Sequence, residues 1–266
     1  MSVTFGPFTF ATHHLIFFIS CATAFLLGWL LSRRQAYGMG DILFRIIAVG
    51  LISARLVFVI KYYDVYLSAP WQLINIRDGG FSLSTGIIAG ILWTGWELYR
   101  LPQAKLRLAT AALSGLFVAV VLTNVSQYYQ QQTGLPALAL TNLEGHAREL
   151  PADFAGQPLV INLWASWCPP CVREMPLLEQ ASTDWPEVAF ITVNQGEGSG
   201  TVEQFLQQQQ LTLPHVLLDA NAELGQAVGS HALPTTLFLH SDGRVSYTHI
   251  GEFNTATLEN ALRRLE

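Results

Sequence analysis

Two cysteines separated by two residues are the part of this sequence best suited to chemistry. Cys168 and Cys171 follow the apolar run 159–164, which predicts a buried strand, and the residues after Cys168 predict a helix start. The first turn of a helix presents unpaired backbone N–H groups and the positive end of the helix dipole, and both favour a thiolate over a thiol. Cys168 is therefore the candidate nucleophile. Cys171, one turn further on, could resolve a mixed disulfide.

Half of a zinc site is the other chemistry that this spacing suits. A zinc site needs two more ligands, usually a second pair of Cys or His residues. The only other cysteine is Cys21, in an apolar stretch, and no His-x3–5-His pair occurs in the C-terminal half. The sequence therefore predicts a redox-active dithiol that uses no metal and no other cofactor, with an inert structural disulfide as the remaining alternative.

The composition indicates a protein that is partly membrane-embedded and partly globular. Of the 266 residues, 51% are hydrophobic and only 12% are charged, and the mean hydropathy is +0.34. Charged residues make up about a quarter of an ordinary soluble domain. The net charge of −5 offers no basic surface, which excludes nucleic acid as a partner.

Four apolar stretches in residues 1–126 predict a transmembrane domain of four helices. A helix needs about 20 apolar residues to cross roughly 30 Å of hydrocarbon, and the candidates are about 15–31, 42–63, 81–99 and 108–125. Arginine and lysine residues concentrate in the first and third loops, which the positive-inside rule places in the cytoplasm. Arg33 and Arg34 follow the first stretch instead of preceding it, unlike the charges of a cleaved signal peptide. Both termini are then expected outside the cytoplasm.

The C-terminal half predicts one α/β domain. The polar stretch 127–134 predicts a short linker, and residues 135–266 are long enough for one core. A hairpin or an extended pair is expected over 137–150, and strands are expected at 159–164, 188–193, 216–218, 237–239 and 245–250. Helices are expected at about 170–184, 202–209 and 257–265. Alternating strands and helices with a terminal hairpin predict a sheet covered by helices on both faces.

Four motifs in this half carry a resemblance to a known family: VINLWASWCPPC at 160–171, EMP at 174–176, VNQGE at 193–197 and LPTT at 233–236. Together they resemble the thioredoxin fold, and more closely the TlpA-like or ResA-like thiol–disulfide oxidoreductases of bacterial envelopes. The resemblance spans roughly residues 136–266. It implies that Cys168 and Cys171 exchange disulfides with other proteins.

The same resemblance implies roles for residues around the dithiol. It implies a cis peptide before Pro234, beside which an extended substrate would pair along Leu233 and Thr235. Glu174 occupies the position of the family's active-site glutamate, where a partly buried carboxylate could exchange protons with the cysteines. A solvated glutamate that only suits the helix dipole remains the alternative. Asn162 stands where cytosolic thioredoxins carry a buried aspartate. The expected rim of the substrate site consists of Trp167, Pro169 and Pro170.

The N-terminal half resembles a second family. The segments Gly6-Pro7, SARLVFV at 53–59 and DGGFSLSTG at 78–86 are similar to the N-terminal part of prolipoprotein diacylglyceryl transferase, over roughly residues 1–100. Ser84 stands where that family has a histidine important for lipid transfer, and the family's later spans are missing. The resemblance implies a truncated relative without transferase activity. Phospholipid binding near Arg55 and the Gly79-Gly80 turn stays open.

These observations predict a bacterial inner-membrane protein whose thioredoxin domain lies in the periplasm and reduces disulfides in other proteins. A membrane relay of reducing equivalents needs a dithiol of its own. The N-terminal half has Cys21 alone, so the expected electron donor is a separate transmembrane thiol reductase, and the remaining expected partner is membrane lipid. One alternative is a disulfide oxidase or isomerase. The other is a lipid-binding or lipid-modifying protein with an accessory thioredoxin domain.

Overall fold

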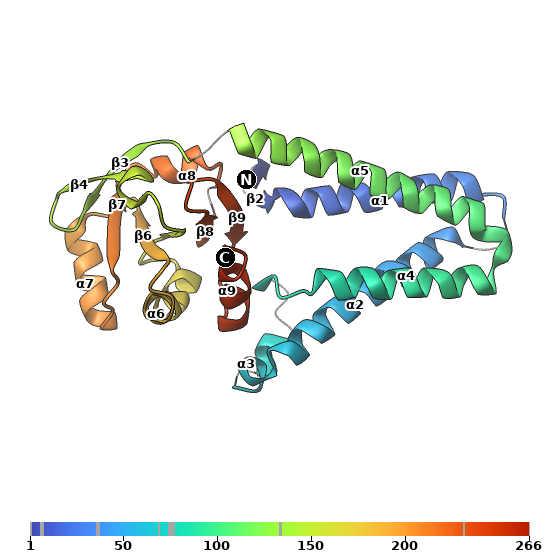
Figure 1. Cartoon of the computed structure of the whole chain (residues 1–266), viewed down its shortest axis with the longest axis horizontal. Helices are drawn as coiled ribbons and strands as arrows, with labels where there is room; N and C mark the ends of the chain where they lie inside the picture. Colours follow the sequence, from blue (N-terminus) through green and yellow to red (C-terminus); the bar gives the residue numbers. More distant parts are fainter. Residues whose placement is uncertain are drawn as a thin grey trace. The chain divides into compact units, whose positions relative to one another are not determined.

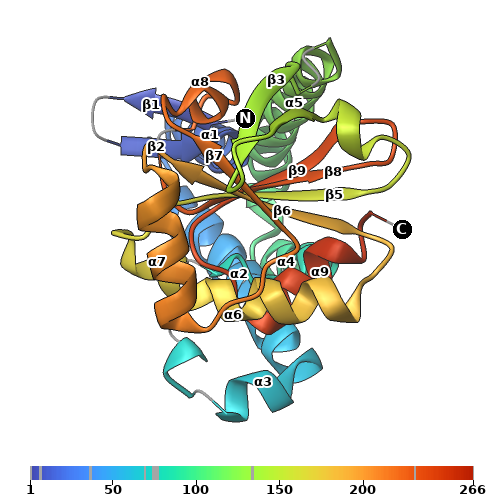
Figure 2. The ribbon, with the colours of Figure 1, turned by 90° about the vertical axis from the view of Figure 1, so that its left-hand side faces the viewer.

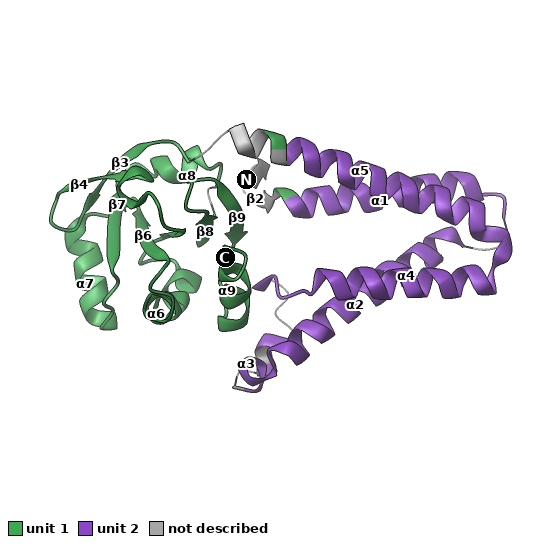
Figure 3. Cartoon of the chain, viewed as in Figure 1, with its two compact units in different colours: residues 1–12, 127–266 green, residues 13–126 purple. Residues whose placement is uncertain are grey.

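The chain forms two compact units, and the first twelve residues belong with the C-terminal one. The computed structural model describes residues 2–5, 8–35, 38–68, 70–73, 78–132, 135–230 and 232–265. Unit 1 comprises residues 1–12 and 127–266, and unit 2 comprises residues 13–126 (Figure 3). Strands β1 (Ser2–Phe5) and β2 (Phe8–Ala11) pair antiparallel and lie in unit 1. The Gly6-Pro7 motif lies outside the described residues.

Unit 2 is helical (Figure 1). Its elements are α1 (Thr12–Ser32), α2 (Met39–Lys61), α3 (Tyr63–Ser68), α4 (Leu83–Arg100), α5 (Lys105–Gln132) and the 3-10 turns η1 (Pro70–Leu73) and η3 (Pro102–Ala104). Among the described residues, three segments are long and apolar enough to cross a membrane: Thr12–Ser32, Met39–Lys61 and Pro102–Ser126. The remaining expected span, 81–99, corresponds to α4, a helix of 18 residues that carries Glu97 and Arg100 and is not among these three segments.

Helix α5 continues into the segment for which the sequence predicts a linker. The helix ends at Gln132, so the polar residues 127–132 are helical, while 133 and 134 lie outside the described residues. Glutamines and tyrosines are compatible with a helix, and the preceding apolar turns supply the nucleus that a short polar segment lacks by itself. A polar composition therefore did not mark the end of the helix.

Helices α2 and α4 contact each other closely and carry polar pairs. A Cβ atom on Gly50 would lie 3.1 Å from the Gly86 carbonyl oxygen, so the two backbones touch, as small residues allow between membrane helices. Near one end of this helix pair, Arg45 Nε donates to Glu97 Oε1 at 2.8 Å. Such pairing is what makes an arginine tolerable in an apolar helix.

Unit 1 is built on a seven-stranded sheet with the order β4-β3-β7-β6-β5-β8-β9 (Figure 2). Strand β5, an interior strand next to the central β6, runs parallel to β6 and antiparallel to β8, and all six residues of β5 are buried. The strands are β3 (Leu138–Asn142), β4 (Ala147–Leu150), β5 (Leu159–Trp164), β6 (Ala189–Gln195), β7 (His215–Asp219), β8 (Thr235–Leu239) and β9 (Val245–Ile250). The expected hairpins at 137–150 and 237–250 are both present.

The three longer helices of unit 1 cover one face of this sheet. Helices α6 (Pro169–Asp184), α7 (Ser199–Gln209) and α9 (Thr255–Leu262) pack on Val160, Trp164 and Phe238, as Figure 2 shows. The opposite face, with Leu159, Ile161 and Leu163, is closed by the short helix α8 (Glu223–Ala227), Leu150 and the 3-10 turn η4 (Ala152–Phe154). The sequence predicts helices on both faces but not α8, which at five residues is too short to show helical periodicity.

Candidate active site

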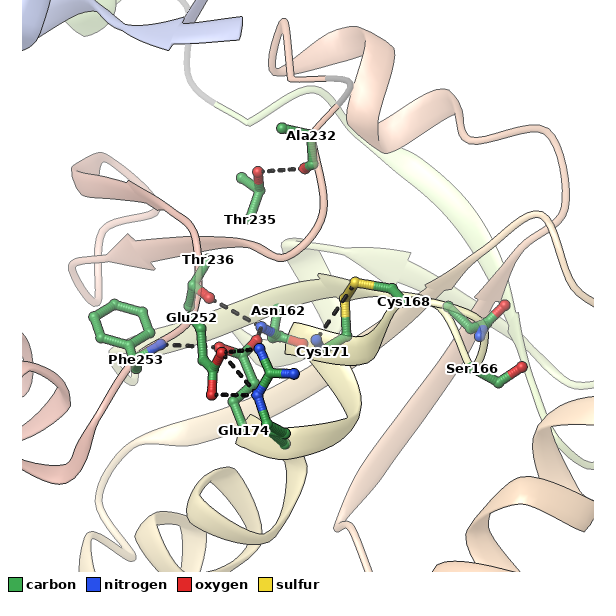
Figure 4. The surroundings of a disulfide bond; sticks show 12 residues. Asn162, Ser166, Cys168, Cys171, Glu174, Ala232, Thr235, Thr236, Glu252 and Phe253 are labelled. Atoms are coloured by element: carbon green, nitrogen blue, oxygen red, sulfur yellow. Dashed lines mark hydrogen bonds and ion pairs between the residues drawn. A yellow bond between two sulfur atoms is a disulfide. The ribbon is translucent and has the colours of Figure 1, made fainter. Parts of the chain in front are cut away.

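Strand β5 and helix α6 place the two cysteines at the helix N-terminus. Cys168 is the N-cap of α6 and is joined to Cys171 by a disulfide (Figure 4). The first two helical residues are Pro169 and Pro170, which have no N–H group. The first N–H of the helix is therefore that of Cys171, and it points to Cys168 Sγ at 3.4 Å. A backbone donor at this position favours a negatively charged Cys168 sulfur once the disulfide is reduced.

The two sulfurs differ in accessibility. Cys168 is 4% exposed and Cys171 is fully buried, so Cys168 is the cysteine that a partner can reach, although it is less exposed than the sequence predicts. Next to it, Trp167 is 68% exposed. Pro169 is exposed and Pro170 half-buried. These three residues lie next to Cys168 in the sequence and are at least partly exposed, and their part in the rim of a substrate site stays a prediction.

The loop before Cys168 is fixed by Glu197, a residue to which the sequence analysis assigned no role. The Glu197 carboxylate accepts hydrogen bonds from the Ser166 amide at 2.7 Å, from the Ser166 hydroxyl and from Asn194 Nδ2 at 2.6 Å. Burial raises the pKa of Glu197, but these hydrogen bonds outweigh it and the net direction is downward. Glu197 therefore stays ionised and holds the loop that presents Cys168. The VNQGE motif was its only sequence signal.

Glu174 is buried beneath the dithiol, which excludes the solvated alternative. It is 1% exposed and lies three residues after Cys171, on the same helix face. Its Oε1 accepts from Asn162 Nδ2 at 2.8 Å and its Oε2 from the Phe253 amide at 3.1 Å (Figure 4). Burial raises the pKa of Glu174 to about 8 despite these two hydrogen bonds. The side chain is therefore protonated near neutral pH and can exchange a proton with a nearby group.

Asn162 reaches Glu174 because of its position in β5. Side chains alternate between the faces of a strand, so Asn162 shares the α6 face with Val160 and Trp164. The amide nitrogen also donates to Thr236 Oγ1 at 2.9 Å. A neutral amide at this position supplies a donor to Glu174 without adding a second negative charge.

The Pro234 segment contributes backbone and apolar surface to the site. The peptide between Leu233 and Pro234 is cis, as the resemblance implies, and a second cis peptide precedes Pro151. Leu233 is half-buried and Pro234 is buried. The Thr235 hydroxyl is fully buried and donates to the Ala232 carbonyl at 2.7 Å. The Thr235 side chain thus stabilises its own loop, and the pairing of a substrate along Leu233 and Thr235 stays a prediction.

The residues of unit 2 singled out by sequence also have defined surroundings. Arg55 Nη1 donates to Asp78 and to the Gly80 carbonyl, both at 2.9 Å, and Nη2 donates to the Gln72 carbonyl at 2.9 Å. Both terminal nitrogens of Arg55 are therefore bonded to protein oxygens. Ser84 is exposed on the first turn of α4.

A disulfide that caps a helix after an interior strand, with a cis-proline segment in the same unit, defines the class of thioredoxin-fold dithiol proteins. Residues 130–265 match the family model Redoxin, and residues 1–132 match the family model prolipoprotein diacylglyceryl transferase. The first match spans half of the chain. The chain belongs to the redoxin family and, within it, to the ResA-like thiol–disulfide oxidoreductases.

Individual relatives show the same grouping. Over 172 residues the chain is 31% identical to the thiol-disulfide oxidoreductase ResA of Geobacillus kaustophilus (strain HTA426), covering 62% of this chain and 96% of that protein. It is 29% identical to the sporulation thiol-disulfide oxidoreductase A of Bacillus subtilis (strain 168), covering 58% and 94%. The crystal structure of StoA from Bacillus subtilis is 27% identical, covers 49% of this chain and 98% of that one, and has a TM-score of 0.43.

The comparisons also bear on the N-terminal half. The prolipoprotein diacylglyceryl transferase match and the three apolar helices associate this chain with a membrane. The chain therefore joins a lipid-transferase-like membrane unit to a thiol–disulfide oxidoreductase, as the two resemblances imply.

Proposed function

We propose that this chain is a membrane-anchored reductase of protein disulfides that works in the periplasm. The observation that carries the proposal is the Cys168–Cys171 disulfide at the N-terminus of α6, with the Cys171 amide directed at the Cys168 sulfur. The redox chemistry comes from the two cysteines alone, without a metal or another cofactor. Trp167, Pro169, Pro170 and Leu233 provide the surface on which the substrate segment lies.

The reaction is two successive thiol–disulfide exchanges. The Cys168 thiolate attacks one sulfur of the substrate disulfide, a mixed disulfide forms, and the other substrate sulfur leaves as a thiolate that takes up a proton. Cys171 then loses its proton and attacks Cys168, which releases the second substrate thiol. Two electrons pass to the substrate and the Cys168–Cys171 disulfide is restored. With a pKa of about 8, a minor fraction of Glu174 is ionised at neutral pH, and in that form Glu174, buried beside Cys171, can accept the proton of Cys171.

A disulfide oxidase or isomerase would use the same exchange steps in another direction, and the arrangement of the cysteines suits all three activities. Lipid transfer has less support, because Ser84 replaces the family's histidine and the terminal nitrogens of Arg55 are bonded to protein oxygens. We infer that unit 2 anchors the dithiol unit, with α4 as a fourth span whose Glu97 is paired with Arg45.

The in-cell redox state of the Cys168–Cys171 pair tests the direction of transfer and the electron donor. In cells with an intact transmembrane thiol reductase we expect the pair to be mostly reduced, and Cys21→Ser should leave this state unchanged, because a lone cysteine cannot relay two electrons. Loss of that reductase should leave the pair oxidised. Alkylation of acid-trapped protein followed by gel shift measures the ratio. A mostly oxidised pair in normal cells would instead indicate an oxidase.

The topology follows from the charges of the loops. Arg33 and Arg34 lie in the first loop, and Arg100, Lys105 and Arg107 flank the third, so both loops are expected in the cytoplasm. A reporter fused after Arg34 should be cytoplasmic and one fused after Gly134 should be periplasmic. An alkaline phosphatase reporter, active only outside the cytoplasm, gives the readout. An inactive fusion after Gly134 at normal abundance would remove the periplasmic assignment.

A further inference from the structure

Two neighbouring contacts join α6 to the segment between β9 and α9. Arg173 and Glu174 are consecutive in α6, and Glu252 and Phe253 are consecutive in that segment. Arg173 Nε lies 3.0 Å from Glu252 Oε1, and its Nη2 lies 2.5 Å from Oε2. One residue further along both segments, the Phe253 amide donates to Glu174 Oε2 at 3.1 Å. Figure 4 shows Glu252 and Phe253 beside Glu174.

The first contact lies at the surface and the second lies in the core. The Arg173 side chain is 56% exposed and that of Glu252 is 27% exposed, whereas Glu174 is buried. An isolated surface ion pair of this kind contributes little to stability. A bidentate arginine–carboxylate pair nevertheless fixes the mutual orientation of its partners more narrowly than one hydrogen bond does. The Arg173–Glu252 pair is therefore expected to fix the relative position of the two segments and to contribute little to the stability of the fold.

The segment that carries Phe253 is held by hydrogen bonds on both sides. Residues 251–254 have no regular secondary structure, but the Gly251 amide donates to the Pro234 carbonyl at 2.9 Å, and Asn254 caps α9 through Thr257. Between these two points the Phe253 amide donates to Glu174. The Phe253 ring stacks on His249 with centroids 3.9 Å apart and meets Phe238 at 5.6 Å. These ring contacts hold the side chain, while the ion pair of the adjacent residue restrains the backbone.

We propose that Arg173 and Glu252 form a positioning pair that holds the Phe253 amide on the Glu174 carboxylate and thereby sets the reactivity of the Cys168–Cys171 dithiol. This inference rests on the proposed function, because it assigns to Glu174 a part in the exchange reaction. Neither residue of the pair touches the reacting sulfurs in this role. Both act through Glu174.

The groups around Glu174 determine whether loss of the Arg173–Glu252 pair makes the Cys168 thiolate form at lower or at higher pH. Asn162 from β5 and the Phe253 amide donate to its carboxylate, and Thr236 from β8 holds Asn162. The titratable and charged groups around it are Cys168, Cys171 and Arg173 from α6, Glu252 from the loop, whose charge raises the pKa of Glu174, and His249 and Tyr247 from β9, which pack on Phe253 or on each other. Losing the Phe253 hydrogen bond favours the neutral acid. In the pH range around 8, where Glu174 would otherwise become ionised, a Glu174 that stays neutral repels a thiolate less, so the Cys168 thiolate forms at lower pH.

The test compares three disruptions of the pair in the reduced full chain in detergent. Arg173→Gln should lower the midpoint pH of Cys168 alkylation by about half a unit, as loss of one donor to Glu174 would. Glu252→Gln loses the same contact but also removes the Glu252 charge, which raises the pKa of Glu174, so it should lower the midpoint by less. The double variant Arg173→Glu with Glu252→Arg restores an ion pair of reversed polarity and should return the midpoint toward the wild-type value. Peptide mass spectrometry separates Cys168 from Cys21. Glu259→Gln, which breaks the Arg263–Glu259 surface pair of α9, is the matched control and should cause no shift.

The possible results separate the alternatives. Opposite shifts in the two single variants would mean that the pair acts through its charges, and unchanged midpoints would mean that it is only a surface contact; either result overturns the inference. Glu174→Gln distinguishes this failure from failure of the proposed function. If Glu174→Gln shifts the profile and the pair variants do not, only the positioning pair is rejected. If Glu174→Gln itself causes no shift, the assigned role of Glu174 is rejected as well.

Discussion

The Cys171→Ser protein should accumulate in cells as mixed disulfides with its substrates, whereas the Cys168→Ser protein should form none. Cys168 is the more accessible sulfur and the one that receives the Cys171 amide at the start of α6. It can therefore attack a substrate disulfide without its partner. The buried Cys171 is needed only to release the product. Both variants should lose disulfide-reductase turnover to the background level.

Non-reducing gels of acid-trapped cells, followed by mass spectrometry of the shifted bands, measure this result. The Cys21→Ser variant is the matched control. It makes the same substitution at a cysteine outside the dithiol, and it should neither trap substrates nor reduce turnover. Mixed disulfides formed by the Cys168→Ser protein alone would reverse the assignment of the two cysteines. Equal trapping by both variants would show that burial does not distinguish them.

The thioredoxin-like unit should become less stable as the pH rises from about 5 to 8, and Glu174→Gln should remove most of that decrease. Burial raises the pKa of Glu174 to about 8 from 4.5. Between these values the unfolded chain releases the proton and the folded protein keeps it, so the folded state binds more protons. Its free energy of unfolding then falls with rising pH. One pKa unit corresponds to about 1.4 kcal/mol, and the loss across this window amounts to roughly 3–5 kcal/mol.

Urea unfolding of the segment 135–266 at several pH values measures this effect. The difference between wild type and Glu174→Gln isolates the contribution of Glu174, because the histidines titrate in both proteins. Glu203→Gln on the exposed side of α7 is the control and should leave the pH dependence as it is in the wild type. If the wild-type and Glu174→Gln curves run parallel from pH 5 to 8, Glu174 does not carry a raised pKa in the folded protein.

The sequence determined the features that depend on local pattern. The apolar run 159–164 predicts a buried strand, and β5 (Leu159–Trp164) is a fully buried interior strand of the sheet. The Ser-Asp-Gly turn predicts the β8–β9 hairpin, and the motif around Cys168 predicts a cysteine at a helix start. Three apolar stretches are confirmed as candidate spans. Periodicity, turn residues and apolar length are properties of residues that are neighbours in the sequence, so they can be recognised without knowledge of the fold.

Only the tertiary structure decided which of these residues meet. The features that the sequence does not show all join segments distant in the chain. They are the packing of α6, α7 and α9 on one face of the sheet, the burial of Glu174 and its hydrogen bond with Asn162, the hydrogen bonds of Glu197 with Ser166, and the ion pair of Arg173 with Glu252. Hydropathy and spacing indicate whether a side chain faces a core, but they do not indicate which residue it contacts in the folded protein. For a carboxylate that difference is decisive, because burial and the number of donors set its pKa. For Glu174 the resemblance implies a role at the dithiol but leaves a solvated glutamate as an alternative, and the fold decides between them by burying its carboxyl group.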